Sequence, residues 1–133
     1  MIFTRKLFRR VILLSFIITI LYVAIEFLPF FTNYERLEEQ LHPGYISEGL
    51  FLVLFILFFV GWLLSLILLY LFKPISRIMY MVSILGILIL SMFTGDMIFY
   101  AITYPLSWFE SFLDIFIMYL IYLTPLKKEF KNK

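Results

Sequence analysis

The sequence predicts an all-α membrane protein, an antiparallel bundle of four transmembrane helices that forms a single domain over residues 1–133. Hydrophobic residues make up 64% of the chain and charged residues 15%, whereas soluble domains are about half apolar and a quarter charged. Apolar runs close to the 20 or so residues needed to span a bilayer occur four times. All 11 Lys and Arg residues except Arg36 flank the same ends of these runs, as topology signals do.

The first helix is expected over residues 8–31, behind a basic N-terminal segment. We interpret it as a retained helix and not as a signal peptide. Its apolar run reaches about 20 residues, and the only small residue near its end, Ala24, follows the bulky Tyr22 at a position where a cleavage site needs a small side chain.

A polar stripe runs along this first helix. Ser15, Thr19, Tyr22 and Glu26 follow one another at steps of four, three and four, which places them on one helical face that should point into the bundle. Small hydroxyl residues allow helices to approach closely, so Ser15 and Thr19 are predicted helix-packing residues. Glu26 lies about 24 Å along the axis from Arg10, near the far boundary of the membrane, and is a candidate site residue.

The hydrophilic stretch 32–47 is predicted to be the first outer loop and to contain a short amphipathic helix. Thr32 and Glu35 have capping-box spacing, and Pro43 ends the helix after Leu41. We interpret its acidic face as solvated. Glu39 and His42 have the spacing of a di-iron motif, but only one such motif is present. A loose divalent-cation site formed between copies is the alternative, and no metal or cofactor is predicted within one chain.

The second helix is expected over residues 49–72, with Ser47 as its N-cap. Gly61 and Ser65 form a small-xxx-small pattern that favours close helix packing. The basic turn 73–77 contains Pro74, so the second and third helices should be antiparallel neighbours.

The third helix is expected over residues 78–102. Ser91 and Gly95 form a second small-xxx-small pattern and are predicted packing residues. Asp96 lies about 27 Å along the axis from Ile78, which places this candidate site residue near the far membrane surface.

The fourth helix is expected over residues 107–126. Ser107 and Glu110 have capping-box spacing, so we favour a capping role for Glu110 over a functional one. Asp114 lies one turn further inward on the same face, where capping no longer accounts for it. It lies about 20 Å from Lys127 along the axis, hence about 10 Å below the outer boundary of a 30 Å core. Asp114 is therefore the leading candidate for an ion, proton or partner site, because a carboxylate at that depth is costly.

The distribution of Lys and Arg places both termini and the turn 73–77 in the cytoplasm. With that orientation the loop 32–47 and the turn around Pro105 face outward. An antiparallel bundle would then gather five carboxylates around its outer mouth, namely those of Glu26, Glu48, Asp96, Glu110 and Asp114.

The C-terminal run Tyr122-Leu123-Thr124-Pro125-Leu126-Lys127-Lys128-Glu129-Phe130, which follows a helix with an acid near its start, resembles the ending of small bacterial four-helix membrane proteins that remain uncharacterised. The layout is also similar, with a basic N-terminus, an acidic first outer loop and a basic central turn. The resemblance implies a location in the bacterial inner membrane and carries no activity or site residue.

We therefore expect a non-catalytic multi-pass inner-membrane protein, an accessory or assembly subunit that packs against other membrane helices. A small oligomeric transporter or channel, with Asp114, Asp96 and Glu26 as cation or proton sites, is the alternative. An enzyme is disfavoured, because one His and no Cys leave only carboxylates and hydroxyls for chemistry. The expected partners are the lipid bilayer and either further copies or a larger membrane complex. The net charge of +2 is too small to indicate nucleic acid.

Overall fold

The computed structural model describes residues 4–26, 46–93 and 103–131, and this part of the chain is helical without any strand. The predicted amphipathic helix in the first loop lies outside the described residues. The elements, in order, are α1 (Arg5–Glu26), α3 (Glu48–Tyr70), α4 (Ile75–Ser91), α5 (Thr103–Leu123) and the 3₁₀ helix η2 (Pro125–Phe130).

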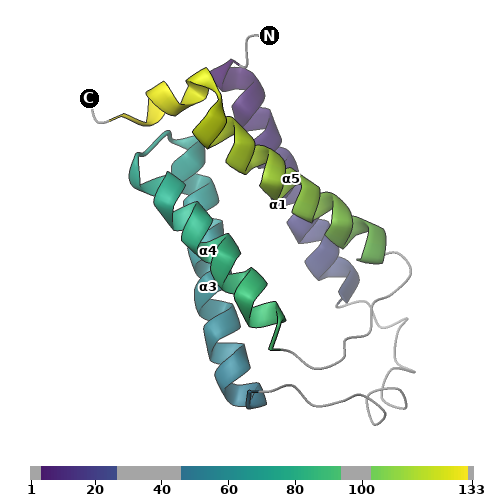
Figure 1. The fold of residues 1–133 in the computed structure, drawn as a ribbon. Helices are drawn as coiled ribbons and strands as arrows, with labels where there is room; N and C mark the ends of the chain where they lie inside the picture. The colour runs from purple at the N-terminus through teal and green to yellow at the C-terminus, as the bar shows by residue number, and fades with distance from the viewer. Residues whose placement is uncertain (1–3, 27–45, 94–102, 132–133) are drawn as a thin grey trace.

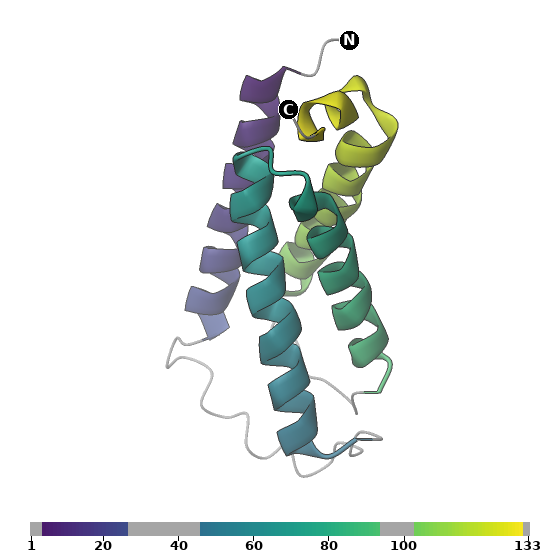
Figure 2. The same cartoon turned by 90° about the vertical axis from the view of Figure 1, so that its left-hand side faces the viewer.

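The four α-helices lie alongside one another, and consecutive helices point in opposite directions (Figures 1 and 2). α3 packs most extensively against α4, and α1 packs against α5. The start of α1, the 3₁₀ helix η2 and the α3–α4 turn lie at the same end of the molecule (Figure 1). We call this the basic end, because all Lys and Arg residues of the described part lie in the first two turns of α1, in the α3–α4 turn, in the first turn of α4, or in and directly after η2. These residues are Arg5, Lys6, Arg9, Arg10, Lys73, Arg77, Lys127, Lys128 and Lys131.

Three helices, α1, α3 and α5, are long and apolar enough to cross a membrane, and α4 is a shorter apolar helix. Large apolar side chains are exposed along their outer faces, and on α3 these include Leu52, Val53 and Leu57. A soluble protein would bury such continuous apolar surface. For the described residues, the predictions of an all-α fold and of long apolar helices are therefore confirmed.

The helix limits differ from the predicted ones mainly at α4 and α5. α4 begins at Ile75, three residues before the predicted start at 78, and it ends at Ser91 instead of 102. Residues 94–102 lie outside the described part. α5 begins at Thr103 instead of 107 and ends at Leu123 instead of 126. There the chain turns into η2, because the Thr124 side chain accepts a hydrogen bond from the Leu126 amide (3.3 Å) and Pro125 follows as the first residue of the new helix.

The two ends of α3 are capped in different ways. The Ser47 hydroxyl accepts from the Leu50 amide at 3.3 Å, so the predicted N-cap is present. At the other end Phe72 has a left-handed backbone with φ 55°, and the Lys73 amide bonds to the Leu68 carbonyl at 2.9 Å. Glycine is the usual residue in such a helix terminus. The backbone strain of a phenylalanine at this position must be offset by the packing of its ring.

That ring belongs to an aromatic cluster at the basic end. The Phe72 centroid lies 5.5 Å from that of Phe8 and 5.3 Å from that of Phe130, and Phe8 and Phe130 meet edge to face at 5.9 Å. The guanidinium of Arg5 lies 5.5 Å above the Phe72 ring and also pairs with the Glu129 carboxylate. The cluster therefore holds η2 against α1 and the α3–α4 turn.

Small residues set the close approach of α3 and α4. A Cβ atom on Gly61 would lie 2.9 Å from the Ser83 Oγ, and one on Gly86 would lie 2.3 Å from the Phe58 ring. Ser65 is fully buried, and its hydroxyl donates to the Trp62 carbonyl at 2.6 Å. These contacts place Trp62 and the buried face of α4 in the centre of the bundle.

Candidate functional site

Two carboxylates of α5 enter the interior of the bundle. Glu110 and Asp114 are one helical turn apart on the same face, and both are partly buried. The Tyr80 hydroxyl on α4 donates to Asp114 Oδ1 at 2.6 Å, and the Thr19 hydroxyl on α1 donates to Glu110 Oε1 at 2.5 Å. α5 is thus linked to two other helices through hydrogen bonds to its carboxylates.

The fourth helix, α3, contributes Trp62. Its side chain is buried, and the indole lies near the Tyr80 hydroxyl and the Asp114 carboxylate. Tyr80 is itself fully buried, and a phenol in that position needs a hydrogen-bond partner. We call Trp62, Tyr80, Asp114, Glu110 and Thr19 the polar centre; it contains a side chain from each of the four α-helices.

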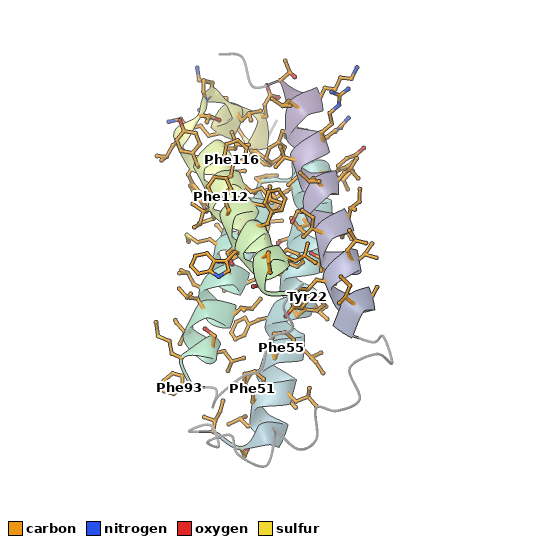
Figure 3. All side chains as sticks on the ribbon, turned by 90° about the vertical axis from the view of Figure 1, so that its right-hand side faces the viewer. Tyr22, Phe51, Phe55, Phe93, Phe112 and Phe116 are labelled. Atoms are coloured by element: carbon orange, nitrogen blue, oxygen red, sulfur yellow. The ribbon has the colours of Figure 1, made fainter. Side chains whose placement is uncertain are left out.

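The α1–α5 interface has a regular antiparallel register. The hydrogen bond between Thr19 and Glu110 fixes one level of it. A step of four residues back along α1 and four forward along α5 places Ser15 opposite Asp114. The same register sets Ile12 at the level of Ile117 and Phe8 at the level of Ile121, and all four of these apolar side chains are fully buried. The interface is therefore apolar towards the basic end and polar further along, and Figure 3 views these two helices from outside.

Asp114 lies closer to the basic end than the sequence predicted. Its partner Tyr80 is only five residues into α4, or about 8 Å along the axis from Ile75. The predicted distance of about 20 Å between Asp114 and Lys127 assumes that the helix continues to Lys127, whereas α5 ends at Leu123. Asp114 therefore lies near the middle of α5.

The capping role expected for Glu110 is wrong. α5 begins at Thr103, so Ser107 lies inside the helix, where its carbonyl accepts from the Ser111 hydroxyl at 2.9 Å. Glu110 therefore lies in the interior of α5, where its carboxylate accepts a hydrogen bond from the Thr19 hydroxyl. The sequence indicated that Thr19 points into the bundle, but it did not indicate this partner.

Tyr80 was not singled out from the sequence, although a signal was present. Ser76, Tyr80 and Ser83 are all buried, and they follow one another at steps of four and three. This is the same inward stripe that drew attention to Ser15 and Thr19 on the first helix.

The other predicted residues fall into three groups. Ser15, Thr19 and Ser65 are buried between helices, and Gly61 faces Ser83. Ser91 is exposed, and its hydroxyl donates to the Leu88 carbonyl at 2.6 Å. Outside the described part lie Gly95, Asp96, the side chains of Glu26 and Glu48, and the acidic loop with His42, so the predicted acidic mouth and the divalent-cation site between copies stay untested.

The described residues contain no group of three or more His, Cys, Asp or Glu side chains that could together hold a metal ion. No protein-family model, curated protein or solved structure was found to match this chain. The chemistry of the polar centre must therefore be inferred from its own geometry: two carboxylates, each bonded to a hydroxyl from another helix.

Proposed function

We propose that this chain is a non-catalytic multi-pass protein of the bacterial inner membrane, an accessory or assembly subunit of a larger membrane complex. The observation that carries the proposal is that both interior carboxylates accept hydrogen bonds from hydroxyls of the chain's own helices. Polar side chains placed in this way hold transmembrane helices together. Both of these interior carboxylates are thus bonded inside the bundle, and the exposed faces of the described helices are left for apolar contacts.

The outer face of α3 and α4 suits packing against other helices. Large apolar side chains are exposed on both helices, among them Val53 and Leu57 on α3 and Leu85 and Ile89 on α4. A hollow of about 370 Å³ lies between the two helices above Gly86. Its lining is almost entirely apolar and comprises Ile46, Leu54, Phe58, Gly86, Ile89, Leu90 and Phe93. Helix association in lipid depends on such close van der Waals fits.

Recovery of a partner tests this role. The tagged chain, purified in a mild detergent from its native host, is expected to carry one larger membrane protein in constant ratio. Ile89→Trp would fill the hollow and should reduce that recovery several-fold. Ile20→Trp, on the exposed face of α1, serves as the matched control and should leave recovery unchanged. Isolation of the wild-type chain only as a free monomer would count against the proposal.

The orientation that we propose places both termini in the cytoplasm. It is supported by the gathering of the described Lys and Arg side chains at the basic end, together with the start of α1, η2 and the α3–α4 turn (Figure 1). Positive charge close to transmembrane helices is retained on the cytoplasmic side.

Single cysteines can report this orientation cleanly, because the chain has none of its own. Lys128 is exposed at the basic end, and a side chain on Gly49, at the opposite end, would meet no atom within 4 Å. We expect a membrane-impermeant maleimide to label Gly49→Cys in intact spheroplasts and Lys128→Cys only after permeabilisation. The opposite pattern would reverse the topology, and labelling of both variants in detergent is the control for reactivity.

A further inference from the structure

One hydroxyl next to the polar centre stands out. Ser15 is fully buried, and its Oγ has no hydrogen-bond partner among the described residues. Thr19 Oγ1, one turn along the same helix, lies 2.9 Å from the Ser15 carbonyl oxygen and 2.5 Å from Glu110 Oε1, and its single proton bonds one of these two acceptors at a time. Buried polar groups are nearly always paired, and an exception calls for a ligand or another explanation. The Ser15 hydroxyl oxygen is therefore unpaired inside the α1–α5 interface and available to bind a ligand.

The register of that interface places Ser15 at the level of a carboxylate. Thr19 bonds Glu110, and one turn towards the basic end Ser15 lies opposite Asp114. Tyr80 donates to one oxygen of Asp114 and Thr19 to one oxygen of Glu110. Since a carboxylate has about four lone-pair sites, both groups keep acceptor capacity. Two hydroxyl groups and two carboxylates thus lie at two successive levels of the α1–α5 interface.

The same place lacks positive charge. The one ion pair among the described residues joins Arg5 to Glu129 at the basic end, and no Lys or Arg of the described part pairs with Glu110 or Asp114. A buried carboxylate is costly unless it is neutralised or paired with a cation. The α1–α5 interface therefore has oxygen ligands and two carboxylates that no positively charged side chain of the described part neutralises.

We propose that Ser15, Thr19, Glu110 and Asp114 form a binding site for one Na⁺ ion between α1 and α5. Hydroxyl and carboxylate oxygens are ligands for hard cations. A divalent ion is disfavoured, because no third acidic or imidazole group joins these two carboxylates among the described residues. The bound ion would tie α1 to α5 and supply the charge that this part of the bundle lacks. The inference does not depend on the proposed role as a subunit.

The test is thermal unfolding of the purified full-length chain in a non-ionic detergent, at constant pH and ionic strength, in NaCl, KCl or choline chloride. A ligand that binds only the folded state raises Tm. For a chain of this size, we expect saturating Na⁺ to raise Tm by about 5 °C over choline. Ser15→Ala and Asp114→Asn should abolish most of this rise, whereas Ser111→Ala, which removes an exposed hydroxyl on α5, should retain it.

Three results would overturn the proposal: equal Tm values in NaCl and choline chloride, a Na⁺ effect that survives both site substitutions, or a larger effect of K⁺ than of Na⁺. If Asp114→Asn does not fold, Ser15→Ala is decisive on its own, because it removes only one oxygen. Equilibrium dialysis with radioactive sodium supplies a second measurement. It should give one ion per wild-type chain, and a ratio near zero would contradict the site even if the chain co-purifies with a partner.

Discussion

Phe130→Ala is expected to lower the free energy of unfolding by about 4 kcal/mol, as the removal of a buried aromatic ring usually does. Phe130 is 2% exposed, and its ring contacts the rings of Phe8 and Phe72. In the proposed orientation this end faces the cytoplasm, where the hydrophobic effect operates fully. Loss of the ring would also leave Phe72 in its left-handed backbone with less packing to offset the strain. Chemical unfolding in mixed micelles measures the change.

Glu129→Ala is the matched control for this prediction. It removes the ion pair with Arg5, whose side chain is 55% exposed, while that of Glu129 is 33% exposed. Exposed pairs of this kind contribute between about 0 and 1 kcal/mol. Phe130→Leu should fall between the two substitutions, because it keeps part of the apolar contact. If Glu129→Ala were as destabilising as Phe130→Ala, charge and not aromatic packing would hold η2 in place.

The helices could be located from the sequence because an apolar run of spanning length has few alternatives to a helix in lipid. Their ends could not be placed as well. Ser107 and Glu110 have capping-box spacing, but α5 begins at Thr103 and the pattern lies inside it. Phe72 ends α3 in a left-handed conformation that glycine usually adopts, and only its three-dimensional contacts with Phe8 and Phe130 account for that choice.

The candidate site was predicted in part. Asp114 followed from the cost of a carboxylate deep in an apolar helix, and the inward stripe of Ser15 and Thr19 followed from helical periodicity. Their pairing did not, because Thr19 and Glu110 are 91 residues apart and belong to the first and last α-helices. The pairing of Tyr80 with Asp114, 34 residues away, was missed for the same reason. Periodicity gives the face of a helix, whereas partners depend on which helices pack together.

Tyr80→Phe is expected to destabilise the fold by about 2 kcal/mol, because a hydrogen bond to a charged group contributes more than one between neutral groups. The substitution keeps the buried ring and removes only the oxygen that donates to Asp114. Tyr122→Phe is the matched control. Its hydroxyl donates to the Arg77 carbonyl at 3.0 Å, so about 1 kcal/mol should be lost. Equal losses in both variants would show that the carboxylate adds nothing to the Tyr80 bond.

A double-mutant cycle separates the Tyr80 bond from the other contacts of each residue. Asp114→Leu alone leaves the Tyr80 hydroxyl buried without its acceptor, and Tyr80→Phe alone leaves the Asp114 carboxylate with one donor fewer. With both substitutions no polar group of this pair remains unpaired, and such double replacements are often nearly neutral. The double variant should therefore be more stable than the sum of the single losses by about 2 kcal/mol. Strict additivity would mean that the two groups do not interact in the folded protein, and the polar centre would lose its link between α4 and α5.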